Sequence, residues 1–460
     1  MANRVITPLD PGFDPVSLAW RTYCRDVDAR GGGVRFVVRI VRGEAQSSAF
    51  EARVFPDGME DARNKSMMDR LVKSLLWIRG GYLIQVSGSP AIHEHLLAAY
   101  QPGGSRAFDA RFMGNVFERP FAVEYVPDPD AIPLCQEVSS AIGLHLDGCR
   151  IGFDAGGSDR KVSAVMDGKT VFSEEVIWFP KVTEDPGYHY REILSAFRAA
   201  ASRLPRVDAI GVSSAGIFID NRVRNASLFL KVPEGLHREK VRDIYINAAR
   251  EIGPVPLTVA NDGDVTALAG AMGLGKGRVL GLAMGTSQAG GYVDDNMRIM
   301  GWLNELAFVP VDLNGDAARD EWSGDIGCGV KYFSQDAVIK LAPAAGIALD
   351  EGLSPAGKLK QMQRELERGH PGATQIFETI GVYLAYALAW YALFYDIGQV
   401  LILGRVTSGQ GGQIILEKAR ETLLHEFPGL SGTFQITLPD EAGRRVGQAI
   451  AAASLPEIKR

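Results

Sequence analysis

The chain has 460 residues, of which 46% are hydrophobic and 23% are charged, a composition typical of folded globular proteins. This length predicts two or three domains. The formal net charge is −6, so no overall positive charge attracts the protein to nucleic acid or to an anionic membrane.

Residues 1–148 are expected to form a separate N-terminal accessory domain of the α+β class. The pattern predicts a strand at 34–41, a helix at 60–78, then strand, turn, short helix and turn over 80–104, and a proline-rich linker at 125–134. Lys and Arg nearly balance Asp and Glu here, so no basic stripe predicts a nucleic-acid partner. No motif says whether this part binds a ligand or mediates oligomerisation.

Neither a signal peptide nor a membrane span is predicted. The first 15 residues contain no apolar h-region, and the most apolar helical stretch, 382–394, is too short to cross a bilayer and is expected to be a buried helix. Four scattered cysteines favour free thiols in a reducing compartment: Cys24, Cys135, Cys149 and Cys328. We expect a cytoplasmic protein, with a homodimer left open.

From residue 149 the pattern changes to strands and helices in alternation, which indicates α/β layers. Strands are expected at 151–154, 162–166, 170–179, 207–214, 257–260, 279–284 and 291–293, with helices at 190–203, 239–252 and 264–273. "FDAGGSDRKVSAVMDG" and "LAMGTSQAGGYVDDN" both read as strand, turn of small residues, strand. This weak internal repeat suggests two similar lobes.

Both small-residue turns are candidates for binding phosphate, because glycine lets the backbone approach a ligand and N–H groups can surround phosphate oxygens. The candidate residues are Gly156, Gly157 and Ser158 in the first turn and Gly285, Thr286 and Ser287 in the second. Asp154 ends the strand before the first turn, where a phosphate-bound Mg²⁺ would need an oxygen ligand. Each turn taken alone is also explained by a tight hairpin. Neither turn fits the P-loop or the Rossmann pattern.

"PLTVANDGDVTALAG" places polar residues at the end of an apolar strand, where they are costly to bury without partners. If these polar residues are functional, a carboxylate is the available base in this region, because no histidine occurs between His237 and His370. The alternative is an ordinary turn with Asp264 as the cap of the next helix.

Six segments resemble the ROK family of sugar kinases and sugar-responsive repressors, in order and spacing. They are "IGFDAGGSDRKVSA", "IGVSSAGIFIDNRVRNA", "VANDGDVTALAGAMG", "LGLAMGTSQAGGYV", "NELAFVPVDLNG" and "VLILGRVTSGQGG", within 149–460. The resemblance implies an α/β fold of two ribonuclease-H-like lobes around a nucleotide and sugar cleft. We expect one lobe at 149–258, completed by a C-terminal helix at 440–460, and the other at 259–439.

The resemblance also implies roles for individual residues. Asp262 would be the catalytic base, and Asp154 would hold Mg²⁺ through water or phosphate. Nucleotide phosphates would meet Gly156, Gly157, Ser158, Lys161, Gly285, Thr286 and Ser287. The substrate would meet Asn261, Glu305, Ser214, Gly216 and Phe308. Gly404 and Thr407 would meet adenosine, although a strand followed by a glycine turn is also common α/β architecture.

The sequence departs from the family in its sugar contacts and in its zinc motif. Phe308 stands where the family has a histidine, Val330 where it has a glutamate and Leu228 where it has an asparagine. We expect these three on the wall of the ligand pocket beside Glu305, the alternative being ordinary core residues. Only Cys328 remains of the cysteine-rich loop, so no zinc is expected.

The predicted function is ATP-dependent phosphorylation of a hydroxyl on a sugar or sugar derivative, with ATP and Mg²⁺ as cofactors. The alternative is a ROK-like protein that senses a sugar or nucleotide without turnover. A small sugar-like molecule is the expected partner, with no nucleic acid and no membrane.

Overall fold

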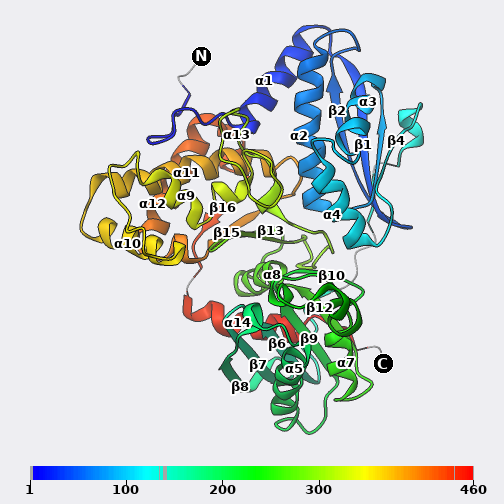
Figure 1. Ribbon diagram of the computed structural model, residues 1–460, viewed down its shortest axis with the longest axis vertical. Helices are drawn as coiled ribbons and strands as arrows, with labels where there is room; N and C mark the ends of the chain where they lie inside the picture. Colours follow the sequence, from blue (N-terminus) through cyan, green and yellow to red (C-terminus); the bar gives the residue numbers. More distant parts are fainter. Residues whose placement is uncertain (1–3, 134, 138–141, 440, 459–460) are drawn as a thin grey trace. The chain divides into compact units, whose positions relative to one another are not determined.

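The computed structural model describes residues 4–133, 135–137, 142–439 and 441–458 (Figure 1). Its contacts divide the chain into two compact units. Unit 1 comprises Met1–Val138, Leu282–Gly290 and Trp302–Leu438. Unit 2 comprises Ser139–Gly281, Gly291–Gly301 and Pro439–Arg460. The expected boundaries differ, since residues from 259 on were assigned to the second lobe whereas the contacts place 259–281 in unit 2.

The N-terminal part of unit 1 contains a five-stranded sheet in the order β4-β3-β1-β2-β5. Its strands are β1 (Val34–Gly43), β2 (Gln46–Val54), β3 (Leu83–Ser87), β4 (Ala122–Tyr125) and β5 (Cys135–Gln136). Its helices are α1 (Val16–Ala29), α2 (Asp61–Arg79), α3 (Pro90–Ala99) and α4 (Ala107–Phe117). The side chains of Phe36, Val38 and Ile40 on β1 are fully buried, and α2 packs on β1 and β2. The sequence analysis did not anticipate α1, β2, α4 or β4.

The rest of unit 1 is built around the sheet β14-β13-β15-β16, formed by β13 (Val279–Met284), β14 (Gln288–Val293), β15 (Gln399–Leu403) and β16 (Gln435–Thr437). Its helices are α9 (Gln335–Leu341), α10 (Pro355–Glu367), α11 (Pro371–Tyr391) and α12 (Gln410–Glu426). The predicted buried helix is confirmed, because α11 has buried residues all round over Ile380–Tyr391 and packs against α12 and α1. Trp20 of α1 contacts Trp390 of α11, with ring centroids 6.0 Å apart.

Unit 2 contains a five-stranded sheet in the order β12-β9-β6-β7-β8. Its strands are β6 (Cys149–Ala155), β7 (Asp159–Met166), β8 (Lys169–Ile177), β9 (Ala209–Ser214) and β12 (Leu257–Asn261), with a two-stranded ribbon of β10 (Ile217–Ile219) and β11 (Arg222–Asn225). The helices are α5 (Pro186–Ala201), α7 (Ile244–Arg250), α8 (Asp262–Leu274) and α14 (Glu441–Ala453), besides the short α6 (Glu234–Leu236).

The C-terminal helix α14 packs directly on the sheet of unit 2, against β6, β7 and β9. A β-carbon on Gly152 of β6 would lie 2.2 Å from the carbonyl oxygen of Ala449, and one on Gly211 of β9 would lie 1.7 Å from that of Ala452. Glycine at these two positions is therefore what lets the α14 backbone approach the sheet. Helix α14 also packs on α8.

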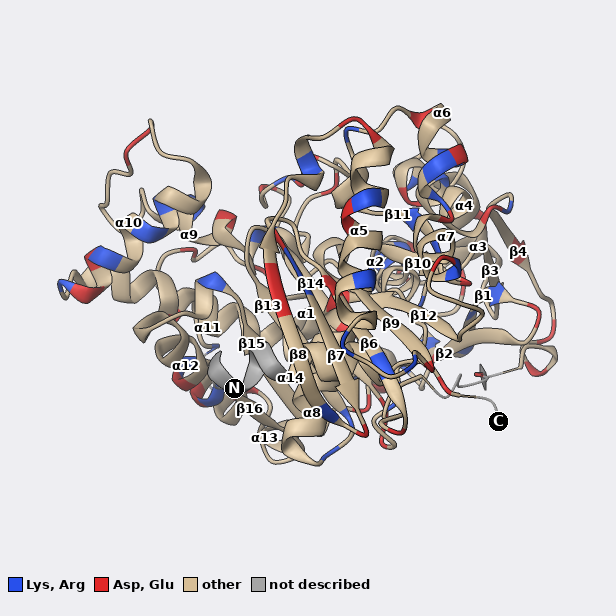
Figure 2. Ribbon diagram, turned by 90° about the horizontal axis from the view of Figure 1, so that it is seen from below, with Lys and Arg blue, Asp and Glu red and all other residues tan. Residues whose placement is uncertain are grey.

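Charged residues of both signs are interspersed over helices and loops (Figure 2). None of the helices in the described part of the chain combines the length and the hydrophobicity that a membrane span needs. Cys24, Cys149 and Cys328 are free thiols.

Candidate functional site

Three parallel strands of unit 2 end at one edge of its sheet and bring the predicted polar residues together. Strand β9 pairs in parallel with both β6 and β12. In this register Asp154 lies opposite Ser213, and Asn261 lies opposite Ser214. Because Asp262 follows Asn261 directly, the carboxyl ends of three strands deliver two carboxylates, an amide and two hydroxyls to one place.

Asp154 is a partly buried carboxylate at the end of β6. Ser213 Oγ donates a hydrogen bond to its Oδ1 at 2.8 Å. Burial, the largest cause, and the negative charge of Asp262 together raise the Asp154 pKa to about 6, against the opposing effects of the Ser213 hydrogen bond and the charge of Lys161. A carboxylate whose pKa is raised by burial and by a second carboxylate at the same sheet edge is typical of functional sites.

Asp262 begins helix α8, and burial raises its pKa as well. The backbone N–H of Gly263 donates to Asp262 Oδ1 at 3.0 Å and, with the charge of Lys181, lowers the pKa again. The helix begins two residues earlier than expected, because Asn261 is its cap, with Oδ1 accepting from the Gly263 N–H at 2.8 Å. Asp264 is not the cap; it is buried, and its Oδ1 accepts from the Tyr292 N–H at 3.1 Å.

The other substrate-contact candidates of unit 2 are Asn261, Gly216 and Ser214, and they make contacts that stabilise the carboxyl edge of the sheet. Asn261 Nδ2 donates to the carbonyl oxygen of Gly216 at 2.8 Å. Gly216 has φ +136°, and a β-carbon there would lie 2.4 Å from the Asn225 carbonyl oxygen, so this position requires glycine. Ser214 is fully buried, and its hydroxyl lies 2.9 Å from that of Tyr245. The sequence reasoning did not find Ser213 or Tyr245, since neither belongs to a recognisable spacing.

The first small-residue turn, residues 156–158, connects β6 to β7, with Gly157 and Ser158 exposed. The Ser158 hydroxyl donates to Asp159 Oδ2 at 3.1 Å. Lys161 lies opposite Asp154 in the antiparallel register, and its Nζ is 3.8 Å from Asp159 Oδ1 and 3.7 Å from Glu175 Oε2. The first turn, Lys161 and Asp154 therefore form one polar group at the end of β6.

Lys181 also reaches this turn, and the sequence reasoning missed it. A β-carbon on Gly157 would lie 2.8 Å from Lys181 Nζ. Lys181 belongs to the short 3-10 helix Pro180–Val182, after β8. The one signal in the sequence is a single lysine among apolar residues, which gives no indication of its neighbours in the fold.

The second small-residue turn, residues 285–287, connects β13 to β14 within unit 1. Gly285 N–H donates to the Ser287 carbonyl oxygen at 3.0 Å, and Thr286 and Ser287 are exposed. Gly404 has φ +104°, and a β-carbon there would lie 2.4 Å from the carbonyl oxygen of Met284, so the loop after β15 passes close to the residue before this turn. Thr407 is buried, and its Oγ1 donates to the Gly404 carbonyl oxygen at 3.0 Å.

The segment that carries Glu305 is held by the end of helix α2. The N–H groups of Asn304 and Glu305 donate to the carbonyl oxygens of Ile78 and Trp77, at 3.0 and 3.1 Å. The rings of Phe308 and Trp77 are stacked, with centroids 4.1 Å apart. The N-terminal part of the chain thus positions a segment that the resemblance assigned to the substrate.

Leu228 corrects one expectation. It has no exposed surface and belongs to the hydrophobic core of unit 2, so it does not line a pocket. The alternative of an ordinary core residue holds at this position, because Leu228 lies in the 3-10 helix Ser227–Phe229 and is buried together with Phe229 in this core. Phe308 and Val330 remain half-buried, and their role at a pocket stays a prediction.

The loop that carries Cys328 is held by buried charges from the N-terminal helices. Asp325 Oδ2 accepts from Lys73 Nζ at 2.5 Å, from Arg70 at 2.8 Å and from Arg106 at 2.5 Å. Burial raises the Asp325 pKa, but these three cations outweigh it and hold that pKa well below its usual range. Burial raises the Cys328 pKa to about 11, which keeps it a neutral thiol.

No group of three or more His, Cys, Asp or Glu side chains that could hold a metal occurs among the residues the structure describes. Mg²⁺ commonly keeps several waters and takes one or two carboxylates together with substrate phosphates. The single carboxylate of Asp154 beside the first turn fits that mode, and it does not fit a cage made of protein ligands alone.

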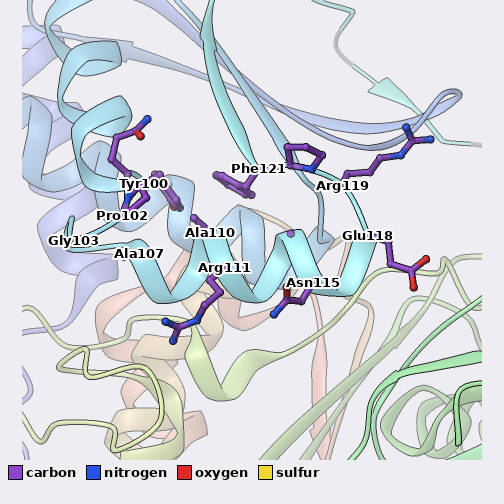
Figure 3. Close-up of a pocket in the computed structure, with 13 residues that line it drawn as sticks. Tyr100, Pro102, Gly103, Ala107, Ala110, Arg111, Asn115, Glu118, Arg119 and Phe121 are labelled. Carbon is purple, nitrogen blue, oxygen red and sulfur yellow. The ribbon is translucent and has the colours of Figure 1, made fainter. Parts of the chain in front are cut away.

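A separate open hollow of about 700 Å³ lies along α4 in the N-terminal part (Figure 3). Tyr100 and Phe121 stack at 5.2 Å beside it, and Arg111 and Asn115 of α4 line it. It contains none of the residues that the sequence predicted for the site.

Comparison with known proteins gives a likeness in fold. No protein-family model matches the sequence, and no curated protein matches it. A ROK family transcriptional regulator, a homologue of the E. coli MLC protein, matches with a TM-score of 0.54 at 17% identity, covering 67% of this chain and 79% of that one. A ROK hexokinase from Thermus thermophilus matches with a TM-score of 0.50 at 19% identity, covering 66% of this chain and 97% of that one.

These matches confirm the expected fold class. The chain has the α/β fold of ROK proteins over about two thirds of its length, and the remaining third accommodates the additional N-terminal sheet. One of these two neighbours is an enzyme and the other a regulator, so the fold by itself leaves both functions open.

Proposed function

We propose that this protein is a ROK-type kinase that transfers the terminal phosphoryl group of ATP to a hydroxyl of a sugar or sugar derivative. The observation that carries the proposal is the pair Asp154 and Asp262. Both are partly buried at the carboxyl edge of the unit 2 sheet, both have raised pKa values, and the first small-residue turn is beside Asp154. The likeness in fold to a ROK hexokinase supports it.

Asp262 takes the role of general base. Its carboxylate accepts the proton of the substrate hydroxyl, whose oxygen forms a bond to the terminal phosphorus as the bond from that phosphorus to the bridging oxygen of ADP breaks. Burial helps this step, because a raised pKa brings the proton affinity of the carboxylate closer to neutral pH. The Gly263 N–H holds the carboxylate at 3.0 Å and fixes its direction.

Each of the two small-residue turns, residues 156–158 and residues 285–287, is assigned by itself to phosphate binding. Their exposed hydroxyls and backbone N–H groups suit phosphate oxygens. Asp154 and Lys161 adjoin the first turn. Bound Mg²⁺ would supply charge neutralisation at the phosphates, and Asp154 is the residue placed to hold it through water.

In unit 1, Glu305 and the half-buried ring of Phe308 are assigned to the acceptor. Phe308 offers no hydrogen bond, and an unpaired buried hydroxyl costs about 1–3 kcal/mol. We therefore expect glucose to be a poor acceptor compared with a sugar that presents a deoxy position or an acyl group to this ring.

A coupled assay of ADP release with Mg-ATP, across hexoses, amino sugars, N-acetyl sugars and polyols, tests the proposal. One or more acceptors should produce ADP with the wild type and none with Asp262→Asn at equal protein concentration. ADP release that is the same with and without every acceptor, and the same in the two proteins, would refute the kinase.

The second candidate is a sensor that binds a sugar or nucleotide without turnover, as the fold likeness to a ROK regulator allows. Isothermal titration of the same panel separates the two functions. Saturable sugar binding with no ADP release identifies the sensor.

A further inference from the structure

The first turn, residues 156–158, is hydrogen-bonded to the segment that follows β8, through Trp178. The Trp178 backbone N–H donates to the carbonyl oxygen of Ser158 at 3.2 Å, and its indole Nε1 donates to that of Gly156 at 2.7 Å. Trp178 is buried, with 1% of its surface exposed. The segment and the turn therefore form one structure.

The residues after Trp178 are braced from α5. The ring of His189 is fully buried, and its Nε2 lies 3.0 Å from the Pro180 carbonyl oxygen. The Phe179 N–H donates to the Tyr188 hydroxyl at 2.9 Å, and Thr183 Oγ1 donates to the Phe179 carbonyl oxygen at 2.6 Å. These hydrogen bonds hold the short 3-10 helix Pro180–Val182, which contains Lys181, in one position.

The ammonium group of Lys181 lies over the first turn. A β-carbon on Gly157 would be 2.7 Å from Lys181 Cε and 2.8 Å from Nζ, so the absence of a side chain at Gly157 is what gives the lysine this place. The positive charge of Lys181 also acts on Asp262, the proposed general base, because it lowers the Asp262 pKa whereas burial raises that pKa. Across the described ranges no acidic side chain forms an ion pair with Lys181, whereas Lys161 lies within 4 Å of two carboxylates.

We propose that Lys181 is a further catalytic residue, whose ammonium contacts the oxygens of the phosphoryl group during its transfer. This inference rests on the proposed kinase function. The transferred phosphoryl group must lie between the first turn and Asp262. Lys181 lies beside this turn, and its charge lowers the pKa of Asp262. A cation placed there neutralises charge on the phosphoryl oxygens, which is the main contribution a protein makes to this reaction. The lysine carries no proton to or from the substrate.

The test compares Lys181→Met, which keeps the aliphatic length, with Lys181→Arg and with the control Lys169→Met. Lys169 is an exposed lysine at the opposite end of β8. Using the best acceptor of the panel, we expect Lys181→Met to lower kcat about 10²–10³-fold, with Lys181→Arg recovering part of the loss and the control unchanged. Titration with Mg-AMPPNP should show weaker binding to Lys181→Met, while adenosine binding should not change.

A second readout excludes a merely structural role. Removing the positive charge should raise the Asp262 pKa, so the acidic limb of the pH–rate profile should move to higher pH in Lys181→Met but not in Lys181→Arg. Wild-type kcat, AMPPNP affinity and pH profile in Lys181→Met would overturn the inference and leave the kinase standing. A wild type that binds no AMPPNP and releases no ADP would overturn both.

Discussion

Asp154→Asn should make the protein more stable at pH 8 while it abolishes phosphoryl transfer. Burial and the charge of Asp262 raise the Asp154 pKa from 3.8 to about 6. Between these two pH values the folded protein keeps a proton that the unfolded chain has released, so stability falls as the pH rises through this window. Well above pH 6 the folded protein carries the full free-energy cost of an ionised Asp154. The uncharged amide of asparagine removes this cost.

The size of the effect follows from the shift. A change from 3.8 to about 6 corresponds to about 3 kcal/mol at pH 8, at most, because the carboxylate keeps some access to water. The same two pKa values leave a gain of only about 1 kcal/mol at pH 4.5. Asparagine also retains an oxygen that can accept the Ser213 hydrogen bond, so this contact is kept in the variant.

The assay is chemical denaturation of wild type and Asp154→Asn at pH 8 and pH 4.5, in buffer with a chelator so that no divalent cation masks the charge. In an Asp262→Asn background the gain should be smaller, because one of the charges that raise the Asp154 pKa is absent. Loss of stability at pH 8, or a gain that does not depend on pH, would refute the account of this site.

Three further outcomes are expected. Asp262→Asn should lower kcat by about 10²–10⁴-fold with folding and AMPPNP binding retained, and near wild-type turnover would remove Asp262 from the role of base. Elemental analysis of chelator-washed protein should find no stoichiometric zinc, because Cys328 is a buried neutral thiol; one equivalent of zinc contradicts this. Lys73→Met should destabilise unit 1, since Lys73 is fully buried against Asp325, but by less than the about 3–5 kcal/mol of a buried charge left without a partner, because Arg70 and Arg106 still bind Asp325. Equal stability of the Lys73→Met protein and the wild type would show that the buried charges are not coupled.

The layout of unit 2 was predictable because its signals are local. Strands β6, β9 and β12 are largely apolar and carry polar residues at or near their carboxyl ends, and parallel strands must place those ends at one edge. Asp154, Asn261 and Asp262 follow from that rule. The strand β2 was missed for the opposite reason: its sequence, QSSAFEARV, is largely polar, and its conformation depends on pairing with β1 from Val34↔Val54 onward.

Contacts between distant segments could not be predicted from periodicity. Lys181 reaches Gly157 because Trp178 and His189 hold its segment in place, and each of these contacts depends on side-chain packing. Leu228 was misplaced for a related reason. Its position was inferred by aligning a loop that contains gaps with a family pattern. An alignment error of one or two residues in such a loop assigns a core residue to a pocket.

The N-terminal part and the altered loop of unit 1 have a common physical explanation. The loop around Cys328 is polar and irregular, and such a segment needs a cross-link to hold one conformation. Here Arg70, Lys73 and Arg106 converge on Asp325, and the segment ending at Phe308 is hydrogen-bonded and stacked on helix α2. Charged side chains from α2 and from Arg106, the N-cap of α4, therefore supply a constraint on this loop. We therefore expect substitutions in α2 to raise KM for the acceptor of the proposed kinase more than they weaken nucleotide binding.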